Sequence, residues 1–216
     1  MSNSVQNKIK NFFTKFPLQR YSKGEIVLDP EDNPSGAYYL ASGHVREYAI
    51  SPQGIEVTIH IFNPHSFFPM TWILSDIPNR YYYEAFTDVE IYSAPKDKII
   101  SFLKQEPDVI FNLTQRIFSG VDKLTARIEH LAFGKAYTRV VSVLIYLARH
   151  FGEKKDDNSV VFKYKLTHRE IASLAGISRE TASREWEKLQ EQSLISYVDQ
   201  MISIKDLKKL EALFTE

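Results

Sequence analysis

The chain has 216 residues, of which 44% are hydrophobic, enough to bury the core of one large domain or two modest ones. Its 27 basic and 27 acidic residues cancel, so any surface for nucleic acid must come from a local cluster of basic residues. The absence of cysteine excludes disulfides, thiolate zinc sites and cysteine-ligated iron–sulfur clusters.

The amino-terminal half is predicted to form a β domain behind a short helix. Residues 5–16 have the apolar spacing of an amphipathic helix, and Pro17 ends it. From residue 21 to about 95, short β-branched and aromatic runs alternate with turn signals such as Ser51–Gly54. Runs at this spacing are typical of a small antiparallel barrel or sandwich.

A long helix is predicted from Pro107 to Phe133, after a short one over 96–104. Its seam follows a 4–3 repeat of mostly apolar residues: Ile110, Thr114, Ile117, Val121, Leu124, Ile128 and Leu131. Such a repeat, with β-branched residues at one position and leucines at the other toward its end, favours a parallel pair of helices. The alternative is a helix that packs on its own β domain.

Residues 134–216 are predicted to form a bundle of helices followed by short strands. Helices are predicted over 136–150, 167–175, 178–192 and 206–214, a polar loop over 152–159, a strand over 160–164 and a hairpin over 195–204. Two helices joined by a short turn and followed by a hairpin are the outline of a winged helix-turn-helix.

The two central helices of this bundle carry strong boundary signals. Thr167 and Glu170 are spaced as a capping box, which predicts the start of the first helix. Gly176 permits the left-handed backbone of a tight interhelical turn, and Ser178 is predicted to cap the second helix. Three apolar residues of the second helix turn inward: Ala182, Trp186 and Leu189.

Polar side chains are left on the outer face where the second helix begins: Arg179, Glu180, Ser183 and Arg184. A recognition helix places its first turns against base edges, where arginine donates to guanine and glutamate accepts from cytosine. Helix starts also bind phosphate. The predicted phosphate contacts are Thr167, His168, Arg169, Ser178 and Thr181. A solvated face on an ordinary helix pair is the alternative, and the agreement of cap, turn and outward charge favours DNA binding.

The segment LTHREIASLAGISRETASREWEKLQEQSLI (166–195) resembles the helix-turn-helix of the CRP/FNR superfamily of bacterial transcription regulators. KGEIVLDPED and YYLASGHVREYAISPQGIEVTI are similar to the sensor β-roll of that family. The resemblance implies a two-domain α+β fold: an N-terminal antiparallel β-roll (a double-stranded β-helix or jelly-roll) over 1–105, a dimerisation helix over 106–133 and a winged helix-turn-helix over 134–216.

The resemblance also implies a function. Glu180–Arg184 is similar to the E-x-x-S-R pattern of the fumarate–nitrate branch, whereas Arg179 is similar to the cyclic-AMP receptor branch. This implies a cytoplasmic homodimer that reads a palindrome with TGA in each half-site. The base outside this core is left open, since Arg179 favours guanine and Ser183 thymine. The implied partners are double-stranded DNA and RNA polymerase, with activation, repression or both as the outcome.

The expected sensor site departs from the family pattern. Cyclic-AMP-binding members carry G-E-x-x-L and then R-S/T-A, where this chain has Phe68-Pro69 and Asn79–Tyr81. Pro69 also lacks the amide hydrogen that a phosphate cradle uses. We therefore expect regulation without cyclic AMP; the alternative is a regulator that depends on a cyclic nucleotide or another small molecule and has a degenerate cassette. The residues that could line an effector pocket, rather than a ligand-free core, are Phe68, Met70, Trp72, Arg80 and Tyr82.

Several classes of function lack support in the sequence. No nucleophile–base pair and no glycine-rich phosphate loop is evident, so no enzymatic activity and no cofactor are predicted. His60 and His65 are five residues apart without a cluster of carboxylates nearby, so no metal or haem site is predicted. No apolar run approaches the roughly 20 residues of a membrane span, and we find no signal peptide.

Overall fold

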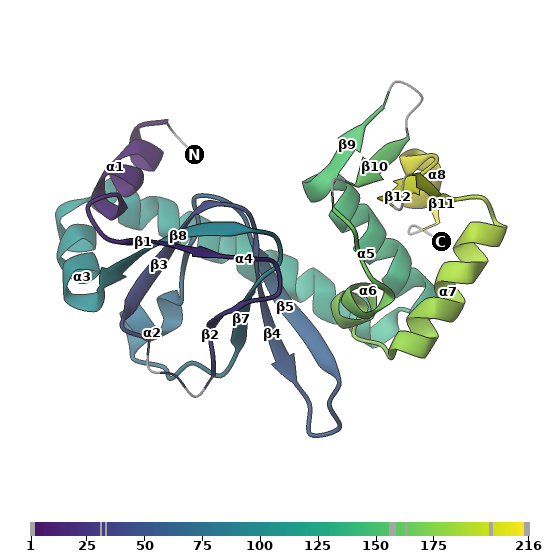
Figure 1. Cartoon of the computed structure of the whole chain (residues 1–216), viewed down its shortest axis with the longest axis horizontal. Helices are drawn as coiled ribbons and strands as arrows, with labels where there is room; N and C mark the ends of the chain where they lie inside the picture. Colours follow the sequence, from purple (N-terminus) through teal and green to yellow (C-terminus); the bar gives the residue numbers. More distant parts are fainter. Residues whose placement is uncertain are drawn as a thin grey trace. The chain divides into compact units, whose positions relative to one another are not determined.

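The computed structural model describes residues 3–30, 32, 34–155, 159–162, 164–198 and 201–213. The chain divides into two compact units, one of residues 1–49 and 58–124, the other of residues 50–57 and 125–216. Figure 1 shows the strands of the first unit in purple to teal, and the helices of the second in green to yellow. The long helix α4 (Pro107–Phe133) begins in the first unit and ends in the second, so neither unit contains it whole.

The first unit contains two four-stranded sheets, with strand orders β1-β8-β3-β6 and β2-β7-β4-β5. The pairs β1–β8, β3–β8, β3–β6, β2–β7 and β4–β7 are antiparallel, as predicted. Its strands are β1 (Leu18–Tyr21), β2 (Ile26–Leu28), β3 (Gly36–Ser42), β4 (Val45–Ile50), β5 (Glu56–Phe62), β6 (Phe67–Phe68), β7 (Tyr82–Ala85) and β8 (Val89–Pro95). Its helices before α4 are α1 (Asn3–Phe13), α2 (Met70–Ser75) and α3 (Lys96–Gln105).

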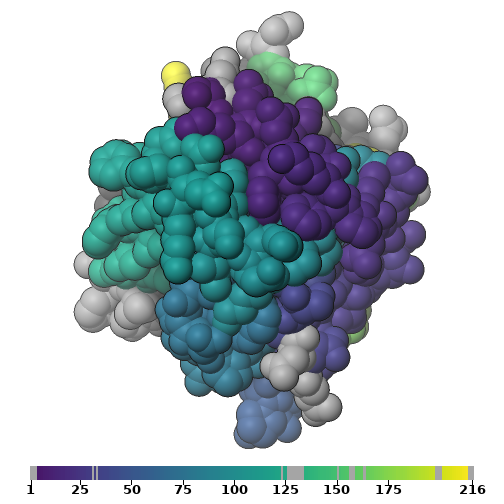
Figure 2. Space-filling view, turned by 90° about the vertical axis from the view of Figure 1, so that its left-hand side faces the viewer, coloured from purple at the N-terminus to yellow at the C-terminus, as the bar shows by residue number. Residues whose placement is uncertain are grey.

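Strand β3 divides the core of this unit in two, because successive side chains of a strand point to opposite faces. Ala37 and Tyr39 join a cluster that α1, α3 and the start of α4 cover. Tyr38 and Leu40 face the other way, into a cluster that draws on both sheets. Figure 2 shows the purple amino-terminal segment packed against teal surface, in agreement with the contacts of α1 in the first cluster.

The helix α2 was not predicted from the sequence. It follows Pro69, which stands at its N-cap, and it ends at Asp76, whose backbone is left-handed with φ of 52°. The Lys96 ammonium donates to the Trp72 carbonyl at 3.2 Å and lies over the Trp72 ring. With only six residues, the helix is too short to give a clear period in the sequence, and tertiary contacts fix it.

The second unit combines helices with a small sheet of order β11-β12-β10-β9. Its elements after α4 are α5 (Ala136–Phe151), β9 (Gly152–Lys154), β10 (Val160–Phe162), α6 (His168–Ala175), α7 (Arg179–Glu191), β11 (Ile195–Val198), β12 (Met201–Ile204) and α8 (Leu207–Ala212). The polar loop predicted over 152–159 is wrong at its start, because β9 pairs antiparallel with β10. The three residues Gly-Glu-Lys show no alternation of apolar and polar side chains. They form a strand because they pair with β10.

Gly36 offers a test of the first unit's packing. A Cβ atom built there would lie 1.8 Å from the Ala94 carbonyl oxygen, on the neighbouring strand β8. We expect Gly36→Ala to lower the free energy of unfolding by about 1–3 kcal/mol, because the added methyl group forces strands β3 and β8 apart. Urea denaturation measures this. Gly120→Ala, on α4 where a Cβ would meet no atom within 4 Å, is the control and should cause no loss; equal stability of the two variants would contradict the packing described.

Candidate nucleic-acid interface

The α6–turn–α7 segment has the boundaries that the sequence predicts. Thr167 caps α6: the Glu170 amide donates to Thr167 Oγ1 at 3.2 Å, and the Glu170 carboxylate accepts from the Thr167 amide at 2.6 Å. Gly176 ends α6 with φ of 63° and ψ of 41°, in the left-handed region that glycine adopts most readily. Thr167, Glu170 and Gly176 thus confirm the predicted capping box and interhelical turn.

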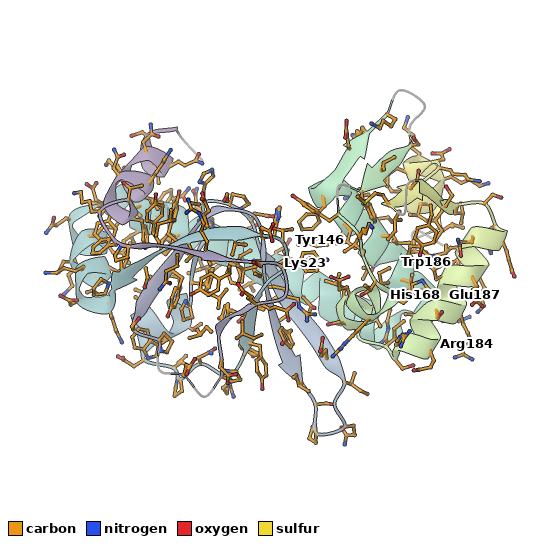
Figure 3. All side chains as sticks on the ribbon, viewed as in Figure 1. Lys23, Tyr146, His168, Arg184, Trp186 and Glu187 are labelled. Atoms are coloured by element: carbon orange, nitrogen blue, oxygen red, sulfur yellow. The ribbon has the colours of Figure 1, made fainter. Side chains whose placement is uncertain are left out.

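Helix α7 buries one face and exposes the other. Ser178 caps it by accepting a hydrogen bond from the Thr181 amide at 3.2 Å. The residues predicted to turn inward are buried: Ala182, Trp186 and Leu189. On the opposite side Arg179, Glu180 and Arg184 are exposed and Ser183 is half-buried. In Figure 3, Trp186 lies on the side of α7 that faces the rest of its unit, and Arg184 lies near the lower end of the helix as drawn.

The exposed charges at the start of α7 are available to a ligand. Arg179 and Arg184 form no ion pair within the parts of the chain that the structure describes. Hydrogen bonds from its own backbone amide and from the Ser178 hydroxyl hold the pKa of the Glu180 carboxyl below its usual range. Glu180 therefore stays ionised and acts only as a hydrogen-bond acceptor, which is the chemistry that a cytosine amino group requires.

The predicted phosphate-binding residues form two groups. Thr167, His168 and Arg169 line a shallow surface hollow together with Arg179. This hollow lies at the start of α6, where backbone amides favour an anion, and its Arg169 side chain is ion-paired with Glu56. In the second group, at the start of α7, the hydroxyls of Ser178 and Thr181 are 3.0 Å apart.

Two hydrogen bonds that link Ser183, His168 and Tyr197 were not predicted from the sequence. His168 Nδ1 lies 3.1 Å from Ser183 Oγ, and His168 Nε2 lies 3.5 Å from Tyr197 Oη. The imidazole also packs against Trp186, with ring centroids 5.4 Å apart (Figure 3). These residues are 15 to 29 positions apart in the chain and come from three elements, so no local pattern could have revealed the contact.

The residues predicted to line an effector pocket are spread over the first unit. Phe68 is buried in the cluster between the sheets, whereas Met70 and Trp72 pack on the other core cluster. Arg80 is exposed, and Tyr82 is half-buried. The side chains around Phe68 are aromatic and closely packed: it stacks on Tyr83 with ring centroids 5.0 Å apart. A role for these five residues in effector binding stays a prediction.

The predicted seam of α4 is open to solvent in the part that the structure describes. Its exposed fractions are 38% for Ile110, 53% for Ile117, 53% for Val121 and 47% for Leu124. Thr114 is also exposed, and its hydroxyl donates to the Ile110 carbonyl at 3.0 Å. The side chains of Ile128 and Leu131 lie outside the description. An exposed apolar stripe of this length on a helix is a feature of interaction surfaces.

The described residues offer neither a cluster of metal-binding side chains nor a membrane-spanning helix. Within the described ranges, no three side chains of histidine, aspartate or glutamate are grouped so that they could hold a metal ion. In the same ranges, no helix combines the length and apolar character needed to cross a membrane.

Two family models match the chain. The model described as a cyclic nucleotide-binding domain matches residues 18–106, and the model described as a Crp-like helix-turn-helix domain matches residues 138–213. The first match covers the two sheets, and the second covers the α6–turn–α7 segment and the small sheet.

Individual relatives agree with these matches. The chain is 28% identical over 200 residues to the global nitrogen regulator of Synechocystis sp., covering 92% of this chain and 88% of that protein. It is 27% identical to the transcriptional regulator SdrP of Thermus thermophilus, over 89% and 92% of the two chains. A crystal structure of a CRP/FNR-family transcriptional regulator from Thermus thermophilus superposes with a TM-score of 0.75 at 26% identity, covering 93% of this chain and 99% of that one.

The capping box that starts α6 can be tested directly. Thr167→Ala removes the side-chain acceptor of the Glu170 amide, and we expect it to lower the free energy of unfolding by about 1 kcal/mol. Chemical denaturation, followed by tryptophan fluorescence, measures the change. Thr167→Ser keeps the hydroxyl and is expected to retain most of the stability. Equal losses in both variants would show that the hydroxyl does not cap the helix.

Proposed function

The chain belongs to the CRP/FNR family of transcription regulators, and from this premise we propose that it binds a palindromic DNA operator as a homodimer. The single observation that carries the proposal is the outer face of α7. Its first two turns present Arg179, Glu180, Ser183 and Arg184 from a helix whose other face is buried. That is how a recognition helix presents side chains to the major groove.

Base recognition is proposed to centre on Arg184 and Glu180. Arg184 has free donors for guanine O6 and N7, and ionised Glu180 accepts from the amino group of a paired or adjacent cytosine. These contacts correspond to a TGA core in each half-site. Arg179 and Ser183 are proposed to contact the base outside this core, where Arg179 favours guanine and Ser183 favours thymine.

Phosphate contacts are proposed to fix the position of α7 along the DNA duplex. One phosphate is proposed to bind at the hollow lined by Thr167, His168, Arg169 and Arg179, and another at the helix start of Ser178 and Thr181. Because the chain has no net charge, these local groups must supply the attraction to DNA. A moderate dependence of affinity on salt is therefore expected.

The partner on α4 is proposed to be a second copy of the chain. The exposed stripe of Ile110, Ile117, Val121 and Leu124 matches the spacing of a two-helix seam. Two copies related by a two-fold axis would place two recognition helices on half-sites one helical turn apart. RNA polymerase is the further partner proposed, with activation, repression or both as the outcome.

Control without cyclic AMP is part of the proposal. Pro69, at the position of the cassette glutamate, is the N-cap of α2 and has no amide hydrogen to give a phosphate. The Asn79 amide group already bonds to the Asp29 and Tyr81 carbonyls, at 3.1 and 2.8 Å. Arg80 offers the one cation of the degenerate triplet. Binding of another small molecule near Phe68 is the alternative proposal.

Arg184→Ala tests the recognition helix. We expect purified, ligand-stripped protein to bind a palindromic TGA…TCA duplex tightly and a scrambled duplex weakly in fluorescence anisotropy at fixed salt. Arg184→Ala should weaken binding to the palindrome by about 1–3 kcal/mol, because a bidentate contact to guanine is lost. Arg149→Ala removes an exposed arginine of α5, in the same unit, and should leave the affinity unchanged. Equal losses in both variants would count against base reading by Arg184.

Val121→Asp tests the seam on α4. A charge at this exposed apolar position must be desolvated when two helices pair, so we expect the variant to be monomeric in size-exclusion chromatography with light scattering. Its DNA affinity should fall with the loss of the second recognition helix. Ser119→Asp adds the same charge on the same helix, off the seam, and should remain dimeric. A dimeric Val121→Asp protein would contradict the proposed seam.

A further inference from the structure

On the outer face of α7, the hydroxyl of Ser183 is hydrogen-bonded to a side chain of α6. Ser183 Oγ lies 3.1 Å from His168 Nδ1, and His168 Nε2 lies 3.5 Å from Tyr197 Oη. Ser183 comes from α7, His168 from α6 and Tyr197 from β11, so the fold of the second unit joins three elements at this point. Trp186, which is 1% exposed, packs against both rings, with centroids 5.4 Å from His168 and 5.8 Å from Tyr197.

The Tyr197 hydroxyl can set which atoms donate and which accept in these two hydrogen bonds. The Tyr197 hydroxyl carries a proton that it can donate to His168 Nε2, 3.5 Å away. A neutral imidazole that accepts at Nε2 carries its proton on Nδ1, and Nδ1 then donates to the Ser183 hydroxyl. Each bond in such a chain polarises the next.

Protonation of the imidazole does not reverse the direction. A doubly protonated His168 also donates from Nδ1 to Ser183. Only the neutral form with its proton on Nε2 would make Ser183 the donor to His168, and that form requires the Tyr197 oxygen to accept. In the other two forms the Ser183 oxygen receives a hydrogen bond, and the Ser183 proton is free to point outward.

We propose that His168, oriented by Tyr197, is a positioning residue that presents Ser183 to DNA as a hydrogen-bond donor. This inference rests on the proposed function and restricts the base that Ser183 reads to one with a carbonyl acceptor at its major-groove edge. Thymine O4 meets this requirement, whereas the amino group that cytosine presents there does not. The contact therefore selects thymine over cytosine at the position outside the TGA core.

The experiment compares thymine with 5-methylcytosine at that position, each paired with its complement in the TGA…TCA duplex. The two pyrimidines share the methyl group and differ in the carbonyl or amino group that faces the major groove. The full chain is expected to bind the thymine duplex about three- to tenfold more tightly, the value of one neutral hydrogen bond. In Ser183→Ala the ratio of the two affinities, thymine duplex over 5-methylcytosine duplex, should fall to about one. This loss shows that Ser183 reads the substituted position.

Tyr197→Phe is the decisive variant. It removes the hydroxyl that orients the imidazole and keeps the ring against Trp186, so the ratio should fall toward one while the preference for the TGA palindrome over a scrambled duplex persists. Tyr137→Phe removes a hydroxyl that bonds to Gln192 in the same unit, away from Ser183, and should leave the ratio intact. His168→Asn, whose amide can donate from the Nδ1 position, should retain more of the ratio than His168→Ala.

The outcomes separate this inference from the proposed function. An unchanged ratio in Tyr197→Phe, or tighter binding of the 5-methylcytosine duplex by the unsubstituted chain, would overturn the positioning role while the TGA preference stands. Absence of any preference for the palindrome over the scrambled duplex would overturn the proposed function, and with it this inference.

Discussion

The left-handed turn at Gly176 is the constraint on which the DNA-reading surface depends. With φ of 63° it ends α6 and lets the Ile177 amide bond back to the Ala172 carbonyl at 3.1 Å, so α7 can start at Arg179. A side chain at this position would strain the backbone. Because α7 then buries Trp186 and Leu189, its opposite face must point outward. The base-reading residues are exposed as a consequence of that packing.

Two arginines, Arg46 of the first unit and Arg184 of the second, have different surroundings. In the first unit, buried Arg46 pairs with Glu84 through two hydrogen bonds of 2.8 and 3.1 Å, and the Tyr83 hydroxyl donates to Glu47 at 2.9 Å. Burial raises the pKa of Glu47, in keeping with an interior closed to solvent. In the second unit, by contrast, the charges of Arg184 are not compensated by a described acidic group. The unpaired guanidinium of Arg184 is therefore available to an anionic partner.

The sequence predicts most of the fold, because its strongest signals are local. Pro107, Thr167, Gly176 and Ser178 each mark a helix boundary that the structure confirms. Contacts between distant residues could not be predicted in this way: β9 depends on pairing with β10, α2 on its tertiary packing, and the Ser183–His168–Tyr197 chain on three elements. The outward placement of the base-reading residues could be predicted from helical spacing, but the hydrogen bond behind Ser183 could not.

Methylation interference at guanine N7 on the TGA…TCA duplex tests the central claim most directly, because this atom lies in the major groove at the proposed Arg184 contact. Methylation of the guanine in each TGA is expected to block binding, with equal effects on the two half-sites. Equal effects would also reflect the proposed two-fold symmetry. Undisturbed binding to N7-methylated guanine, with interference instead at adenine N3 in the minor groove, would contradict the placement of α7 in the major groove.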